Sequence, residues 1–251
     1  MLQASGATDK GAVRPTNEDR FAIDESLGLC VIADGMGGHQ AGEIAADTAI
    51  DAVLEVARDR HRVGWPFGID PSLSEAGNVI RTGIYLANMR ILEMAGSSSA
   101  YAGMGTTIVA ALATDGRLSV GHVGDSRLYR VDGGRFRQLT GDDSWMAAVM
   151  ANNPRTDAAQ LEYHPMRHVL TNVVGSRSRT EVHVVEESLS PGDQLLLTTD
   201  GVHGVLEGRR LQGAVTGADG PAAAAHDLVR AAIARGSRDN CTAVVARYVG
   251  D

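Results

Sequence analysis

Residues 27–60 read LGLCVIADGMGGHQAGEIAADTAIDAVLEVARDR, and this stretch decides the fold. Together with FAID at 21–24, the segment LGLCVIAD predicts two strands joined by a polar turn. From Ala41 to Arg60, apolar residues recur at helical spacing. The apolar strand therefore ends on Asp34, and a glycine-rich turn leads from it into a helix.

Strands outnumber helices in the rest of the chain. We expect a second helix from the capping box Ser72-x-x-Glu75 to about Ala95, and a third over 221–235. The first twenty residues alternate only loosely, and 142–180 read as irregular and partly helical. Further strands are expected at 106–114, 117–125, 126–131, 136–140, 181–187, 194–200 and 241–249. This order indicates an α+β layered domain, not the regular βαβ alternation of a doubly wound fold.

The composition is that of a globular protein without membrane spans. Its 251 residues suit one large domain or two small ones, and because no repeat or linker divides them we expect a single domain over 1–251. They are 43% hydrophobic and 22% charged, which excludes disorder. No apolar run approaches the ~18 residues of a membrane span, and the N-terminus lacks the basic and apolar regions of a signal peptide. Cys30 and Cys241 provide no disulfide framework. We therefore expect a cytoplasmic protein that does not bind membranes.

The charged residues exclude two large classes of function. With a net charge of −8, the chain lacks the basic face typical of nucleic-acid-binding proteins. Lys10 is the only lysine among 23 basic residues, so the chain contains no Gly-x-x-x-x-Gly-Lys-Ser/Thr phosphate loop. Aspartate supplies 20 of the 31 acidic residues, which fits either a turn-rich fold or a carboxylate metal centre.

Two aspartates stand where a metal ligand would be rigidly aimed. Asp34 and Asp200 each end an apolar strand and precede a glycine, and no pairing strand follows directly. Such an aspartate is more often a turn former or a helix cap, so either one alone indicates little. The glycines after Asp34 let the backbone approach a ligand closely and expose a carbonyl oxygen, which Mg²⁺ or Mn²⁺ accepts as a ligand.

Six motifs occur in a fixed order along the chain. They are Arg14-Pro15-Thr16-Asn17-Glu18-Asp19, Ala33-Asp34-Gly35-Met36-Gly37-Gly38-His39, Gly105-Thr106-Thr107, Gly124-Asp125-Ser126-Arg127, Thr199-Asp200-Gly201-Val202 and Asp239-Asn240-Cys241-Thr242. In this order and spacing they resemble the PPM family of metal-dependent serine/threonine phosphatases, also called type-2C phosphatases, in its compact bacterial form. The resemblance covers nearly the whole chain. It implies a four-layer α-β-β-α sandwich, in which helices flank two mostly antiparallel sheets, with a flap subregion at about 140–180.

The resemblance also implies a reaction and the residues that carry it. The family hydrolyses phosphoserine and phosphothreonine in proteins with a water that bridges two divalent ions, Mn²⁺ or Mg²⁺. By similarity, the metal ligands are Glu18, Asp34, Gly35, Asp125, Asp200 and Asp239. Asp34 would touch both ions, and Asp125 would belong to a third, weaker ion. Asp19 would be an outer-shell partner, and Arg14 would position the substrate phosphate.

Two departures from the family pattern affect the general acid and the flap. Met36 stands where eukaryotic relatives have a histidine proposed to protonate the leaving alcohol, as is usual in the bacterial branch. The acid is then either a metal-bound water, our first choice, or His39. In the flap, Asp142-Asp143-Ser144 replaces the Asp-His-Ser of bacterial relatives. We assign no catalytic role to Asp143.

The implied partners are phosphorylated proteins that a bacterial serine/threonine kinase modifies, and we expect a monomer. Three alternative functions fit the sequence less well. Cys241 and Arg247 match the Cys-x5-Arg spacing of cysteine phosphatases, but an apolar strand lies between them and no helix follows. His122 and His203 lack the clustered spacing of a zinc site. A catalytically inactive PPM domain that only binds a partner would lose metal-site aspartates that this chain keeps.

Overall fold

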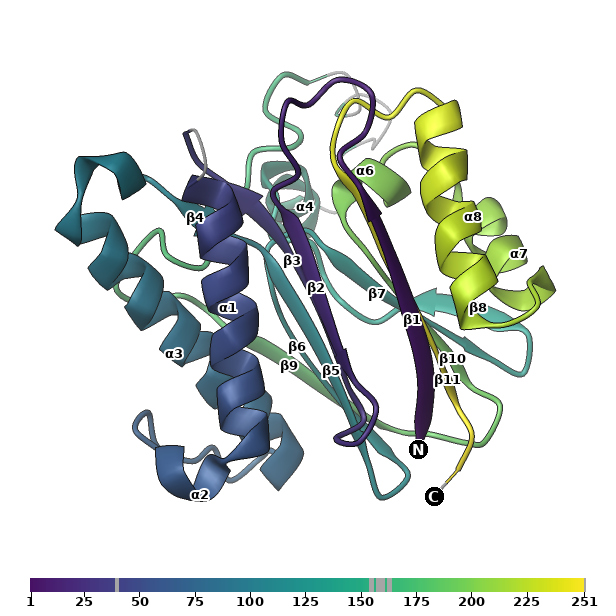
Figure 1. The fold of residues 1–251 in the computed structure, drawn as a ribbon, viewed down its shortest axis with the longest axis horizontal. Helices are drawn as coiled ribbons and strands as arrows, with labels where there is room; N and C mark the ends of the chain where they lie inside the picture. The colour runs from purple at the N-terminus through teal and green to yellow at the C-terminus, as the bar shows by residue number, and fades with distance from the viewer. Residues whose placement is uncertain (39–40, 154–155, 157–160, 162–163, 251) are drawn as a thin grey trace.

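Two antiparallel sheets lie face to face between two layers of helices in the computed structural model, which describes residues 1–38, 41–153, 156, 161 and 164–250 (Figure 1). The first sheet has the order β1 (Leu2–Asp9), β11 (Cys241–Tyr248), β10 (Gln194–Thr198), β7 (Arg127–Asp132) and β8 (Arg135–Gln138). Its edge strand β1 pairs with β11 from Leu2 opposite Tyr248 to Asp9 opposite Cys241. The two ends of the chain therefore belong to the same sheet.

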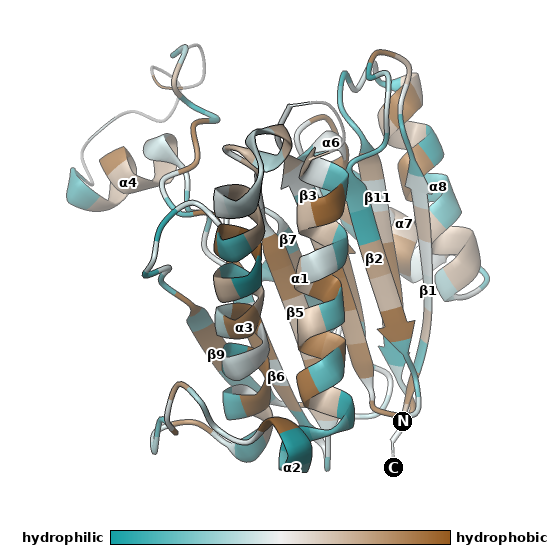
Figure 2. Cartoon of the chain, turned by 60° about the vertical axis from the view of Figure 1, so that its left-hand side comes forward, coloured by the Kyte–Doolittle hydropathy of each residue, from teal (hydrophilic) through white to brown (hydrophobic). Residues whose placement is uncertain are grey.

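The second sheet carries the strand that contains Asp34, which continues two residues beyond the predicted end, to Met36. Its order is β2 (Asp19–Asp24), β3 (Leu29–Met36), β5 (Ile108–Thr114), β6 (Arg117–Val123) and β9 (His183–Ser188), and the short β4 (Gly105–Thr106) pairs with the end of β3. The inner strands are almost continuously apolar because each is covered on both faces, by helices on one side and by the other sheet on the opposite side. Figure 2 shows this hydrophobic layer behind the two long helices.

Two helices cover each sheet on its outer face. α1 (Ala41–Arg58) and α3 (Glu75–Ser97) cover the second sheet, while α7 (Gly208–Gly217) and α8 (Pro221–Ala234) cover the first. The contact face of α1 is rich in alanine, which allows close packing on α3. At the crossing, a side-chain carbon on Gly83 would lie 2.8 Å from the Cα atom of Val53, so only glycine fits there. The shorter helices are α2 (Arg60–Val63), α4 (Trp145–Asn152), α6 (Asp200–His203) and the 3₁₀ turn Ser99–Tyr101.

The predicted α+β fold with four layers is confirmed, but several details of the prediction were wrong. Ser72 does not cap the second long helix. Its hydroxyl donates to Asp70, and Ser74 caps the helix by accepting from the backbone N–H of Gly77 at 3.1 Å. The prediction also missed β1 and α7, whose apolar residues are too few to give a clear period. The first predicted helix ends two residues early, at Arg58, because Asp59 caps the next short helix.

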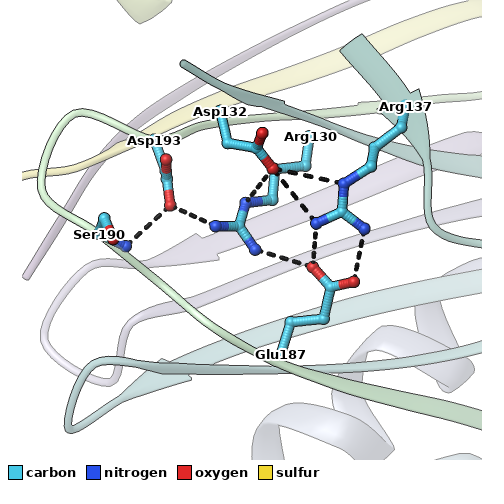
Figure 3. A network of polar contacts seen from close by, with 6 residues as sticks. All are labelled: Arg130, Asp132, Arg137, Glu187, Ser190 and Asp193. Atoms are coloured by element: carbon cyan, nitrogen blue, oxygen red, sulfur yellow. Dashed lines mark hydrogen bonds and ion pairs between the residues drawn. The ribbon is translucent and has the colours of Figure 1, made fainter. Parts of the chain in front are cut away.

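A network of buried ions joins the two sheets far from Asp34 (Figure 3). Arg130 of β7 is 7% exposed, and it donates to Glu187 of β9 at 2.8 Å and to Asp193 at 2.7 Å. Arg137 of β8 forms a bidentate pair with the same Glu187 carboxylate. Hydrogen bonds from Arg137 are the main reason that the pKa of Glu187 is lowered. The two arginines of one sheet thus hold one carboxylate of the other.

Because Arg130 is buried beside the buried carboxylate of Asp193 and also pairs with the partly buried Glu187, we expect Arg130→Ala to lower the free energy of unfolding by about 3 kcal/mol. Arg58→Ala is the matched control, since Arg58 pairs with Asp24 but is 59% exposed, and its loss is expected to be below about 1 kcal/mol. Urea unfolding of both variants measures the two values. Equal losses would contradict the structural role of the buried network.

Candidate active site

A pocket of about 860 Å³ opens where strands of both sheets end, beside the start of α6, which Figure 1 labels. Segments that are far apart in the sequence line it together. Five acidic side chains face it, and the one arginine among its lining residues is Arg14. The acidic residues are Glu18, Asp34, Asp125, Asp200 and Asp239. The structure therefore brings together every carboxylate that the resemblance assigned as a metal ligand.

Asp34 is fixed near the end of β3 by Thr106 and Thr107, which lie where the neighbouring strands β4 and β5 meet. Its carbonyl oxygen accepts from the N–H of Thr107 and from the hydroxyl of Thr106, both at 2.9 Å, and its N–H donates to Thr107 Oγ1 at 3.1 Å. Both backbone groups are thus held, and the carboxyl group projects into the pocket. Burial, together with the nearby Asp19 and Asp200 carboxyls, raises the pKa of Asp34 well above its usual range.

Gly35 allows β3 to meet the start of α1. A side-chain carbon on Gly35 would lie 2.0 Å from the carbonyl oxygen of Gly42, a distance that no side chain can tolerate. The N–H of Gly35 donates to the carbonyl of Glu18 at 3.2 Å, which ties the two predicted ligands together. Glu18 in turn packs its carboxyl group against Gly42, and burial raises its pKa.

Asp19 lies behind the pocket and not in its wall. It is 1% exposed, and its Oδ2 atom accepts from the hydroxyls of Thr199 at 2.8 Å and Thr242 at 2.7 Å. Since Asp19 begins β2 and Thr242 lies in β11, this carboxyl joins the two sheets beneath the site. Its other oxygen, Oδ1, is buried and has no hydrogen-bond partner among the described residues. Burial raises the pKa of Asp19 to about 7.

Asp200 begins α6 and points toward Asp34. The two carboxyls are within hydrogen-bonding reach of each other, while Oδ1 of Asp200 is buried and unpaired within the described part of the chain. Burial, and next the negative charge of Asp239, raise the pKa of Asp200 to about 6. Two carboxyls in contact are stable only if a proton or a cation lies between them.

Asn240 holds the part of the pocket wall that carries Arg14 and Glu18, a role that the sequence did not reveal. Its Oδ1 atom accepts from the N–H of Glu18 at 2.8 Å, and its Nδ2 group donates to the carbonyls of Lys10 and Thr16 at 3.0 and 2.9 Å. Asn240 therefore holds the loop that carries Arg14. The guanidinium of Arg14 donates to Asp239 Oδ2 at 2.6 Å, and this bond raises the pKa of Arg14.

Asp125 follows β6 on the third side of the pocket. Gly124 before it has a φ of 95°, a conformation that favours glycine, and turns the chain so that Asp125 faces the other carboxyls. The next residue, Ser126, shares a 2.8 Å hydrogen bond with Thr107, which also holds Asp34. Burial, and then the charge of Asp200, raise the pKa of Asp125 to about 7.

The charge balance of the pocket favours divalent cations. Burial and mutual repulsion raise the pKa of most of its carboxyls, and two buried carboxylate oxygens have no partner among the described atoms. Carboxylate oxygens are the ligands that Mg²⁺ and Mn²⁺ prefer, so the donor set fits these ions. As the side chains lie, no three described His, Cys, Asp or Glu residues are grouped closely enough to hold an ion. Asp239 is turned toward Arg14 instead.

Neither a general acid nor a cysteine nucleophile is found among the remaining candidate residues that the structure describes. His39 lies outside the described residues, and Met36 lines the pocket without a proton to donate. Cys241 is buried, and burial raises the pKa of its thiol to about 11, which is the opposite of what a cysteine nucleophile needs. The cysteine-phosphatase alternative is therefore not supported.

Asp143, where the sequence departs from the family pattern, organises the base of the flap. Its carboxylate accepts from the N–H of Gly124 at 3.0 Å and from Asn172 at 2.8 Å, and it contacts Nε2 of His183 at 3.0 Å. The ring of His183 lies 5.0 Å from that of His122. This residue therefore links the flap to the turn that orients Asp125, a positioning role that the sequence pattern did not reveal.

Comparison with known proteins gives consistent matches. The profile described as "Protein phosphatase 2C" matches residues 12–222. Protein phosphatase PhpP of Streptococcus pneumoniae is 29% identical over 244 residues, which are 96% of this chain and 95% of that protein. The crystal structure of serine/threonine phosphatase PstP/Ppp of Mycobacterium tuberculosis matches with a TM-score of 0.87 at 28% identity, covering 99% of each chain. The catalytic domain of PstP in complex with two manganese ions matches with a TM-score of 0.81 at 30% identity, also over 99% of each chain.

We expect the folded protein to lose stability in acid because of His122. It is 3% exposed, and burial, next the charge of His183, lowers its pKa to about 4, although Asp143 and Asp142 act in the opposite direction. Below its ordinary pKa of about 6.5, the unfolded chain binds a proton that the folded chain does not. Stability is therefore present above pH 6.5 and falls by up to about 3 kcal/mol as the pH drops to 4.

The contribution of His122 is measured as the difference between the wild type and His122→Asn in urea unfolding at pH 7 and pH 5. The variant is expected to lose less stability on acidification than the wild type. His61→Asn, at an exposed position, is the control and should follow the wild type. An unchanged pH dependence in His122→Asn would show that His122 does not titrate on unfolding.

Proposed function

The chain belongs to the protein phosphatase 2C family, also called the PPM family, and from this membership we propose that its pocket of carboxylates is the metal centre of the enzyme. The protein is a metal-dependent serine/threonine phosphatase, which hydrolyses phosphoserine and phosphothreonine in proteins. The observation that carries the assignment of the site is the convergence of five acidic side chains and one arginine in a single pocket.

Each carboxylate has a position that suits a separate role. Asp34 interacts electrostatically with Asp19, Asp200 and Asp125, which suits a ligand shared by two ions. The Gly35 carbonyl would complete the shell of one ion, and Glu18, Asp200 and Asp239 would hold the second. When bound, two such ions bind the phosphoryl oxygens and lower the pKa of a water so that it attacks at neutral pH. Asp19, from behind, would orient this shell through its unpaired oxygen.

Arg14 is the residue that would receive the phosphate. Its side chain is 53% exposed at the mouth of the pocket, and its planar guanidinium suits two phosphate oxygens at once. It now pairs with Asp239, so a divalent ion on Asp239 would release the guanidinium for the substrate. Arg14 would thus be freed as the metal site fills.

Asp125 would serve a third, weaker ion. Asp125 lines the same pocket just after β6. On one side of it, Gly124 donates its N–H to Asp143, and on the other side the hydroxyl of Ser126 is hydrogen-bonded to Thr107. Either Mn²⁺ or Mg²⁺ fits this all-oxygen donor set. The identity of the general acid stays a prediction, with metal-bound water ahead of His39.

The wider setting is also a proposal. The substrates would be phosphoproteins that a serine/threonine kinase modifies, and the protein would act as a cytoplasmic monomer. None of the described helices has the length and hydropathy needed to cross a bilayer. Pairing of β1 with β11 supports a single phosphatase domain over 1–251, since both ends of the chain complete one sheet.

Asp34→Asn tests the metal centre directly. Removing one of several repelling charges is expected to raise the melting temperature in EDTA by about 2–4 °C, the shift that ~1 kcal/mol produces in a chain of this size. The same variant should lose both tight Mn²⁺ sites in isothermal titration calorimetry and fall below about a tenth of wild-type turnover. A variant that is more stable, binds no metal and is inactive indicates a site built for cations.

Asp125→Asn is the matched control, because it removes a charge from the same pocket and should keep both tight sites. Retention of two tight Mn²⁺ sites in Asp34→Asn would contradict the bridging role. The inactive-domain alternative is tested with wild-type protein: it predicts no hydrolysis of p-nitrophenyl phosphate in Mn²⁺, whereas a phosphatase hydrolyses it and stops when EDTA is added.

Arg14→Ala is expected to raise KM for a phosphopeptide by about tenfold or more and to lower kcat less, since a phosphate-binding group acts mainly on substrate affinity. Mn²⁺ affinity should change little or rise, because Asp239 loses its competing partner. Arg238→Ala, an exposed neighbour outside the pocket wall, is the control and should match the wild type. An unchanged KM would assign Arg14 only to its ion pair.

A further inference from the structure

A second pocket, which we call the α3 groove, runs along the outer face of α3, the helix at the far left of Figure 1. It has a volume of about 500 Å³. Its lining includes the apolar residues Phe67, Tyr85, Met89 and Leu92 and the two arginines Arg81 and Arg179. The rings of Phe67 and Tyr85 lie 5.5 Å apart, and the Arg81 guanidinium lies over the Tyr85 ring at 5.0 Å from its centre.

The groove combines apolar surface with unpaired positive charge. Met89, a large apolar residue of the lining, is 49% exposed. Neither Arg81 nor Arg179 forms an ion pair with a carboxylate in the described part of the chain, whereas ten other arginines there do. A hydrogen bond from Ser72 is the main reason that the pKa of Asp70 is lowered, and the charge of Arg81 contributes only a smaller part. In a protein with a net charge of −8, two such arginines mark a site for an anionic partner.

The shape of the groove favours an extended segment over a compact molecule. The α3 residues that line it run from Arg81 to Leu92, on one face of the helix. Eleven helical steps cover about 16 Å, which matches about five residues of extended chain. The groove is also held in place, because Asn88 accepts from the N–H of Gly175 at 2.8 Å and donates to the carbonyl of Arg177 at 3.1 Å.

One stretch of chain borders both the α3 groove and the active site. Leu170 and Val173 line the pocket of carboxylates, and Ser178 and Arg179 line the groove. Between them, Val174 exchanges two 3.0 Å backbone hydrogen bonds with Thr106, the residue whose hydroxyl donates to the Asp34 carbonyl. From Val173 to Ser178 the chain can reach at most about 18 Å, so one substrate could contact both sites.

We propose that the α3 groove docks an extended segment of the phosphorylated substrate protein, with apolar side chains on Phe67, Tyr85 and Met89 and an acidic side chain between Arg81 and Arg179. The proposal rests on the proposed phosphatase function. The reach between the two sites places this segment about five to ten residues from the phosphorylated residue. Docking there would select among phosphoproteins without changing the chemistry at the metal centre.

The first test is selection of a random peptide display library on the wild-type chain. We expect enrichment of peptides that join an acidic residue to an aromatic or branched aliphatic residue. This enrichment should disappear on the double variant Arg81→Glu/Arg179→Glu and weaken on Met89→Ser. It should persist on Arg209→Glu, which reverses an exposed arginine on α7, away from the groove. No such enrichment, or equal enrichment on the double variant, would overturn the proposal.

The second test joins a selected segment to a phosphothreonine peptide at a spacing of five to ten residues. KM is expected to fall about tenfold relative to the same peptide with a Gly/Ser segment, and the double variant should lose this gain. Hydrolysis of p-nitrophenyl phosphate by the double variant should equal that of the wild type. If neither substrate is hydrolysed in Mn²⁺, the proposed function fails. If both peptides are hydrolysed with the same KM, the docking proposal alone fails. It also fails if analytical ultracentrifugation shows that the wild type is a dimer through this groove and that the double variant is a monomer.

Discussion

Repulsion among buried carboxyls is the constraint on which the rest of the structure depends. Burial raises the pKa of Asp34, Asp125 and Asp200, and the charges of neighbouring carboxyls raise the pKa of each further. Such a cluster opposes folding unless rigid neighbours hold it in place and cations neutralise it. The rigid neighbours are supplied by the chain itself, and the donor set of the site fits the divalent cations that would neutralise it.

Polar bonds from the scaffold hold the cluster against this repulsion. Thr107 fixes the backbone of Asp34 and, through Ser126, the turn of Asp125. Asp19 joins the two sheets below the pocket through Thr242, and Asn240 fixes the loop of Arg14. At the far end, the buried arginine network performs the same task between β7 and β9. The two sheets are therefore joined by polar contacts at both ends of an apolar interior, which keeps the site geometry fixed.

The sequence predicted what depends on periodicity and on motif order. The apolar strand to Asp34, the long helices and the set of pocket carboxylates follow from such patterns, so fold and site were both largely predictable. The edge strand β1 was not, since its pairing with β11 depends on residues 240 positions away. Nor was the cap of α3, where Ser72 and Ser74 are both suitable and only the tertiary contact of Ser74 with Glu186 decides. Asp143 and Asn240 act through bonds to distant backbone groups, which no local pattern encodes.

The most direct test of the metal centre is a crystal structure of the wild-type chain grown with Mn²⁺, with ion positions taken from anomalous diffraction at the manganese edge. We expect two strong peaks in the pocket about 3.5–4 Å apart, each within bonding distance of the Asp34 carboxylate, and Arg14 released from Asp239. A single peak, or two peaks of which one does not touch Asp34, would contradict it.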